Sequence, residues 1–166
     1  MKIEIMSGAM AAAMLWAGGA VAQDAPAQSA PPTEEAQASP GPSVAWGVFS
    51  RSDTRRYLID IGSIARNGDE AEVMVARVAT DTGAGDYTHT LDRFAGRCRA
   101  RQIHVVTTTD VSAEGQADEP YATDEPWEPI NPRSFDAAIH EIACEESEPQ
   151  QPHYPSIKAY IDAGRP

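Results

Sequence analysis

Hydrophobic and polar residues alternate along much of the chain after residue 44, a pattern typical of half-buried β-strands. The alternation and the enrichment in β-branched residues predict five strands, in segments 44–49, 57–61, 72–80, 87–94 and 97–110. In segment 72–80, Val75 faces one side while Ala76 and Val78 face the other. We therefore expect this segment to be a central strand that is covered on both faces.

A different periodicity, of three and four residues, appears after residue 130 and predicts an amphipathic helix. Its apolar face consists of Phe135, Ala138, Ile139 and Ile142. Asn131 and Ser134 are residue types that cap helix N-termini. The acidic residues after Cys144 oppose the negative end of the helix dipole, so we expect the helix to end near Ala143. The alternative is a longer helix with Cys144 on its flank.

These elements predict one α+β domain over residues 44–146, with an antiparallel sheet of about five to six strands and a C-terminal helix packed on one face. Segment 111–127 interrupts the pattern with prolines and acidic residues and is predicted to be a surface loop. Segment 147–166 is predicted to be a Pro-rich tail with a short helix near residues 156–163. The sequence leaves open whether that helix docks on the domain.

The first 22 residues are typical of a secretory signal peptide, with Lys2, a short apolar run and small residues before Gln23. The alternative is a membrane anchor, but the apolar run is shorter than the roughly 20 residues that a spanning helix needs. We expect no membrane span after cleavage. Segment 23–43 contains five prolines and no large apolar residue, so it is predicted to be a disordered Pro/Ala-rich leader.

Export gives the two cysteines, Cys98 and Cys144, a structural role. In an oxidising compartment an even pair usually forms a disulfide, whereas metal sites need more ligands at closer spacing. We expect a Cys98–Cys144 disulfide that ties the sheet to the helix. The alternative is two free, buried thiols. No cysteine lies near the predicted cleavage point to carry a lipid anchor, so we expect an exported protein, periplasmic or extracellular, that is not a lipoprotein.

The formal net charge of −12 makes nucleic acid and anionic membrane surfaces poor partners, because both would repel the chain. The four histidines stand singly, without the spacing of metal ligands. No catalytic triad, nucleophile motif or cofactor motif is recognisable. We expect no enzyme, no cofactor and no metal site; a small hydrolase with an unrecognised carboxylate site is the alternative.

Three arginines are the best candidates for a binding surface: Arg97, Arg99 and Arg101. In a strand over residues 97–110 they would share one face, and aligned guanidinium groups favour carboxylates, sulfates or an acidic partner. The competing interpretation is that they pair with the acidic segment 110–128 of the same chain, which has no basic residue.

Several short motifs resemble the bacterial surface-adhesin E family when their order is considered together. They are Trp46, the segment Tyr57-Leu58-Ile59-Asp60 followed by Ser63-Ile64 and Arg66, Cys98 among arginines, Trp127 with Ile130, Pro132 and Ser134, and the closing Ile142-Ala143-Cys144. The resemblance covers roughly residues 44–144. The chain departs from the family pattern at Arg97, where an Asp usually precedes the first cysteine, and it has no lipobox cysteine.

The resemblance implies a sheet of about six strands with a helix tethered to its concave side by the disulfide. It also implies a protein-binding function, with a protein of the host matrix or of the envelope as partner, and the ability to form a homodimer. The alternative function is that of a periplasmic structural or envelope-stress protein. No ligand-binding residue is carried over from the family.

Overall fold

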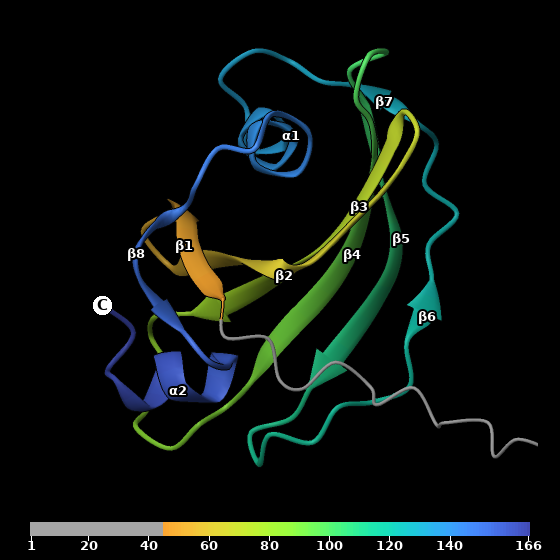
Figure 1. Ribbon diagram of the computed structural model, residues 1–166. Coiled ribbons are helices and arrows are strands. Elements are labelled where there is room, and N and C mark those ends of the chain that lie inside the picture. Colours follow the sequence, from red (N-terminus) through yellow and green to blue (C-terminus); the bar gives the residue numbers. More distant parts are fainter. Residues whose placement is uncertain (1–44) are drawn as a thin grey trace, which may run out of the picture. The chain divides into compact units, whose positions relative to one another are not determined.

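One antiparallel sheet and two helices make up residues 45–166, which are the residues that the computed structural model describes (Figure 1). The elements in chain order are β1 (Trp46–Arg51), β2 (Arg55–Asn67), β3 (Glu70–Ala79), β4 (His89–Arg97), β5 (Gln102–Val111), β6 (Tyr121–Ala122), β7 (Glu128–Pro129), α1 (Phe135–Glu145), β8 (Gln150–Tyr154) and α2 (Ile157–Asp162). The predicted signal peptide 1–22 and leader 23–43 lie outside the described residues.

The sheet follows the chain closely, because β1 to β5 are neighbours in sequence order. The full order is β6-β5-β4-β3-β2-β1-β8, and β7 pairs with a separate part of β5. The predicted α+β fold is confirmed, and so is the central position of the strand that contains Val75. The described residues form eight strands rather than five or six, because the short β6, β7 and β8 have no clear alternation in sequence.

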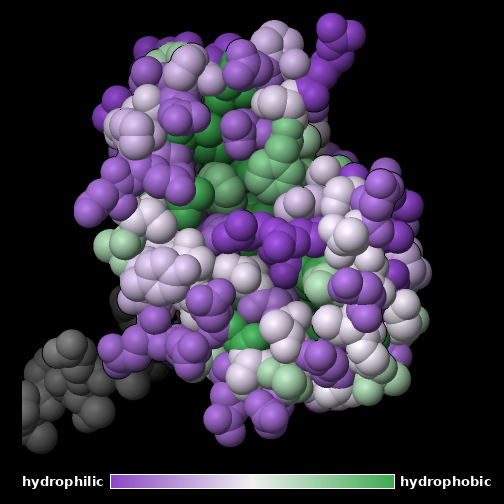
Figure 2. All heavy atoms as spheres, turned by 180° about the vertical axis from the view of Figure 1, so that it is seen from behind, coloured by the Kyte–Doolittle hydropathy of each residue, from purple (hydrophilic) through white to green (hydrophobic). Residues whose placement is uncertain are grey.

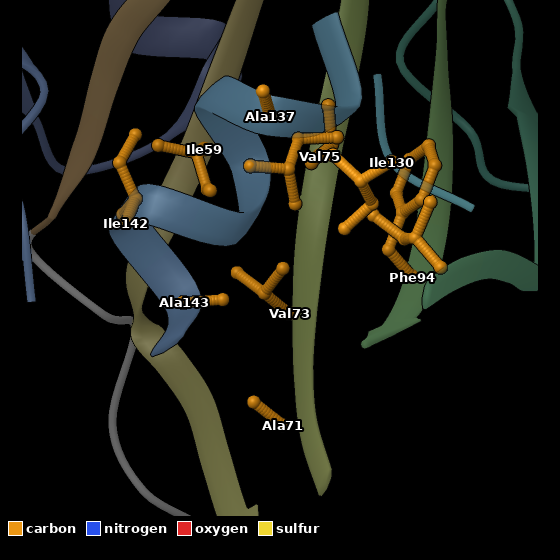
Figure 3. Packing of buried hydrophobic residues seen from close by; sticks show 11 residues of the cluster. Ile59, Ala71, Val73, Val75, Phe94, Ile130, Ala137, Ile142 and Ala143 are labelled. Atoms are coloured by element: carbon orange, nitrogen blue, oxygen red, sulfur yellow. The ribbon is translucent and has the colours of Figure 1, made fainter. Parts of the chain in front are cut away.

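Helix α1 lies inside the curve of the sheet and closes a hydrophobic core (Figure 1). In Figure 3, Ala143 of α1 points toward Val73 of β3, and Phe94 of β4 lies beside Ile130. The buried members of this core are Ile59, Ala71, Val73, Val75, Phe94, Ile103, Ile130, Ala137, Ile139, Ile142 and Ala143. Burying a large aliphatic or aromatic side chain stabilises a fold by about 1.5–3 kcal/mol, so this contact is the main reason that α1 stays on the sheet.

Different contacts stabilise the two ends of α1: a side-chain cap at its N-terminus and an arginine from the sheet near its C-terminus. The Oγ of Ser134 accepts a hydrogen bond from the N–H of Ala137 at 3.1 Å, which confirms the predicted cap. The expected end near Ala143 is wrong, because the helix continues to Glu145. Arg66 of β2 donates from Nε to the carbonyl of Ala143 at 2.8 Å, and its positive charge stabilises the negative end of the helix dipole.

The predicted disulfide between Cys98 and Cys144 is confirmed, with the two Cα atoms 5.6 Å apart. Cys144 lies within α1 and packs against the margin of the core, which is the flanking position that the sequence left as an alternative. Beside it, His140 is only 4% exposed, and its Nε2 donates to the carbonyl of Cys98 at 3.0 Å. The end of α1 is therefore joined to the sheet by a covalent bond and a buried hydrogen bond.

The opposite face of the sheet carries a second core, formed with β8 and α2. Its buried members are Val48, Leu58, Ala76, Val78, Ile157, Tyr160 and Ile161. Strand β8 pairs with β1, and Gly47 of β1 permits this approach, since a Cβ at that position would lie 2.5 Å from Cγ of Pro149. Segment 147–166, predicted as a Pro-rich tail with a short helix, thus supplies a strand as well as the helix, and both pack on the domain.

The surface seen from behind is mostly hydrophilic (Figure 2). Hydrophobic residues come into view on this face mainly within a hollow in its upper half, and a band of hydrophilic residues crosses the middle. Tyr121 is the one large hydrophobic side chain in residues 45–166 that is strongly exposed, at 52%. The other large hydrophobic side chains of residues 45–166 are therefore at least partly covered by the fold.

Removing the disulfide by replacing Cys98 and Cys144 with alanine is expected to lower the free energy of unfolding by about 4 kcal/mol, because the unfolded chain loses its crosslinked loop. Urea unfolding followed by circular dichroism measures this change. Reduction of the unmodified chain should give a similar loss. An unfolding midpoint that is unaffected by both treatments would contradict the structural role of the crosslink.

Replacing Tyr160 with alanine is expected to lower the free energy of unfolding by about 3–5 kcal/mol, since the side chain is fully buried between α2 and the sheet. Tyr121→Ala is the matched control, and this exposed residue should change stability by less than about 0.5 kcal/mol. Thermal and urea unfolding of both variants test the prediction. Equal effects at the two tyrosines would show that α2 does not dock.

Candidate binding surface at the arginine turn

A tight turn over residues 98–101 joins β4 to β5 and is organised by Asp69 from the neighbouring β2–β3 turn. The N–H of Cys98 donates to the carbonyl of Asp69 at 2.8 Å. The N–H of Arg99 donates to the carboxylate of Asp69 at 3.0 Å, and its Nε donates to the same oxygen at 2.9 Å. Arg101 closes the turn in the left-handed region, at φ 49°. Asp69 thus provides hydrogen bonds that a continuous strand would obtain from its neighbours.

The predicted strand over residues 97–110 is wrong at its beginning. Arg97 is the last residue of β4, Arg99 and Arg101 lie in the turn, and β5 begins at Gln102. The three arginines therefore do not form a row on one strand face. They gather at one end of the β4–β5 hairpin, and we refer to Arg97, Arg99 and Arg101 together as the arginine turn.

Each guanidinium of the arginine turn has an acidic neighbour from elsewhere in the fold. Nε of Arg97 lies 3.4 Å from Oε1 of Glu70, and Nη1 of Arg101 lies 3.2 Å from Oε1 of Glu145. Together with Asp69 beside Arg99, these acidic partners come from β3, the β2–β3 turn and the end of α1. The competing interpretation, that these three arginines pair with carboxylates of the acidic segment 110–128, is therefore wrong.

Trp127 is part of this surface, although the sequence pattern placed it only at the end of the predicted surface loop 111–127. Its ring lies under Arg97, with the guanidinium carbon 4.0 Å from the ring centroid. His104 lies on the ring as well, with the two centroids 4.1 Å apart. Only the fold brings Trp127 to the arginines, because the intervening chain includes all of β5 and the loop after it.

The exposed ion pairs leave the arginine turn available for other contacts. The side chain of Arg99 is 86% exposed, and only its Nε is engaged by Asp69. Exposed ion pairs contribute little to stability, so a carboxylate of another molecule can compete with the intramolecular partner. The turn itself stays fixed, because Cys98 is bonded to α1. The surface can therefore offer guanidinium groups and an aromatic ring in a stable arrangement.

Metal-binding groups and membrane-spanning helices were also sought among residues 45–166. No group of three or more His, Cys, Asp or Glu side chains in residues 45–166 is placed to hold a metal ion. Neither of the helices described has the length and the apolar character needed to cross a bilayer.

The pKa of Asp69 lies below its usual value of 3.8, mainly because of the hydrogen bond from the Arg99 side chain and then that from the Arg99 N–H. The carboxylate therefore stabilises the fold above pH 3.8, and this contribution is lost as the pH falls through the lowered pKa. In the Arg99→Gln variant the pKa of Asp69 should rise only part of the way toward 3.8. The backbone N–H of residue 99 still donates to the carboxylate and keeps the pKa lowered.

Titration of the Asp69 carboxyl carbon by NMR measures that shift, and Arg93→Gln is the control with an arginine remote from Asp69. A pKa for Asp69 that is the same in the Arg99→Gln variant and in the unmodified chain would exclude the side-chain contact.

Comparison with known proteins gives one match, to a family model. The family model described as surface-adhesin protein E matches residues 46–145, more than half of the 166-residue chain, and the match ends at the last residue of α1. No curated protein and no solved structure gives a significant match. The family description points to an exported or surface protein, to binding of other proteins and to a non-enzymatic role. The chain belongs to the surface-adhesin protein E family.

Proposed function

We propose that this chain is an exported protein-binding module and that the arginine turn, with Trp127 beside it, is its contact surface. The observation that carries the proposal is the gathering of three guanidinium groups and an indole ring at one end of the β4–β5 hairpin. Arginine and tryptophan are enriched among the residues that dominate protein–protein binding energy. Membership of an adhesin family supports the same class of function.

The partner surface that fits the arginine turn is acidic. A guanidinium binds a carboxylate through two parallel N–H groups, and this geometry gives both strength and orientation. The disulfide holds Cys98 within the turn, so little conformational freedom of the backbone is lost when a partner binds. We therefore infer a partner that presents Asp or Glu side chains, either in the host matrix or in the bacterial envelope.

The location that suits this function is outside the cytoplasm. A disulfide between Cys98 and Cys144 forms and persists in an oxidising compartment, and the family description supports an exported or surface protein. The predicted signal peptide over residues 1–22 is in keeping with export. We infer that the protein is released into the periplasm or beyond it and that binding takes place there.

Replacing Arg97, Arg99 and Arg101 together with glutamine is expected to weaken binding to an acidic protein partner at least about tenfold, because the charge-assisted contacts are lost. Biolayer interferometry of the purified chain, with immobilised basement-membrane proteins on one sensor and immobilised envelope proteins on another, measures the effect and separates the two sources of partner.

The matched control replaces three exposed arginines elsewhere, Arg51, Arg93 and Arg133, so that the net charge changes equally. This control should bind as the unmodified chain does. Equal weakening in the two triple variants would mean that only overall charge matters, and it would reject the arginine turn as the contact surface.

A further inference from the structure

The sheet face that carries α1 changes from apolar to polar beyond the helix. Cross-strand pairing places Val75, Asp92 and Thr108 in one row across β3, β4 and β5. Two positions further along β3, the next row on the same face contains Arg77, Thr90 and Asp110. Val75 belongs to the core under α1, whereas the row of Arg77 lines a cavity of about 290 Å³. This cavity lies at the end of the β4–β5 hairpin opposite the arginine turn.

Arg77 is held in place by a buried carboxylate. Asp92 is 2% exposed; its Oδ1 accepts from Nη2 of Arg77 at 2.8 Å, and its Oδ2 lies 2.6 Å from Nε. The hydroxyl of Thr108 also donates to Oδ1, at 2.9 Å. Nη1 of Arg77 takes no part in this pairing. A guanidinium fixed along one edge in this way is oriented before any ligand arrives, which lowers the cost of binding.

A second guanidinium on the same face comes from Arg55 of β2. Arg55 pairs with Ala79 in the β2–β3 register, and Arg77 lies two positions from Ala79, so the two arginines line one cavity from neighbouring strands. Arg55 is exposed, and within residues 45–166 its side chain has no hydrogen bond or ion pair. It is therefore available to an anion at no cost to the fold.

The opposite wall of the cavity carries a negative charge. Asp110 of β5 lines it and accepts a hydrogen bond from the hydroxyl of Thr90 at 3.3 Å. Arg77 and Asp110 are separated by β4, which is two strand spacings or about 10 Å between backbones before their side chains extend. The cavity thus presents positive charge on one side and negative charge on the other.

We propose that this cavity binds a small zwitterion about the size of a dipeptide, with its carboxylate between Arg55 and Arg77 and its ammonium group at Asp110. Ligand pockets in proteins usually begin at about 300 Å³, so the cavity has room for a small molecule or a short peptide terminus. A simple anion would meet Asp110, and a simple cation would meet the two arginines. Only a ligand with both charges satisfies both walls.

Glycylglycine is the probe that tests this proposal. Its binding is monitored by ¹⁵N NMR of the purified chain at probe concentrations up to about 50 mM, which saturates a site with a Kd of about 1 mM. The amide signals of Thr88, Thr90 and Val111, which line the cavity, should shift in a saturable manner. N-acetyl-glycylglycine has no ammonium group and glycylglycinamide has no carboxylate, so each should bind at least about tenfold more weakly.

Two variants test whether the amide shifts depend on the charged side chains of the cavity. Arg55→Gln and Asp110→Asn should each weaken glycylglycine binding about tenfold, while Arg93→Gln, on the opposite sheet face, should leave it unchanged. No saturable shift with the unmodified chain, equal binding of either blocked probe, or full binding by Arg55→Gln would each overturn the proposal. The triple substitution in the arginine turn should not alter these shifts, so this site and the proposed protein-binding function are tested independently.

Discussion

The crosslink between Cys98 and Cys144 is the constraint on which the arrangement of this domain depends. Helix α1 has 11 residues, and a helix of that length is marginal in water without tertiary contacts. Apolar burial holds its face on the sheet, but the disulfide, the hydrogen bond from His140 to Cys98 and the contact from Arg66 to Ala143 all act at its C-terminal end. The same bond therefore fixes the end of the helix and the turn that carries the arginines.

Features that depend on local sequence could be predicted, and those that depend on distant residues could not. The alternation around Val75 identified a central strand, and Ser134 identified the start of α1, because each signal lies within a few residues. The turn at residues 98–101 contains no Gly, Pro, Asn or Asp, since its hydrogen-bonding partner is Asp69 from another hairpin. The end of α1 was misplaced for the same reason, because Arg66 lies 77 positions before the carbonyl that it contacts.

In the candidate site, too, the local features could be predicted from the sequence and the contacts between distant residues could not. The three arginines could be selected from the sequence by their spacing, but their positions in space could not, because a turn replaces the start of the expected strand. Trp127 gave no local signal that it would lie against Arg97. Residues 147–166 were difficult for another reason: β8 lies at the sheet edge, contains Pro152 and buries little of its surface. The family match also ends before this segment, so β8 and α2 extend the matched domain.

The binding of acidic groups proposed for this chain, whose net charge is −12, would depend on short-range contacts. At physiological ionic strength charges are screened over about 8 Å, so the many distant carboxylates repel an acidic ligand only weakly once it is in contact. Binding then depends on how well a few guanidinium groups are oriented before the ligand arrives. At one end of β4 the disulfide and Asp69 fix the turn of Arg99, and nearer the other end Asp92 fixes Arg77. At both ends of the hairpin, a covalent bond or hydrogen bonds thus orient the guanidinium groups in advance. An excess of positive charge is not needed for this.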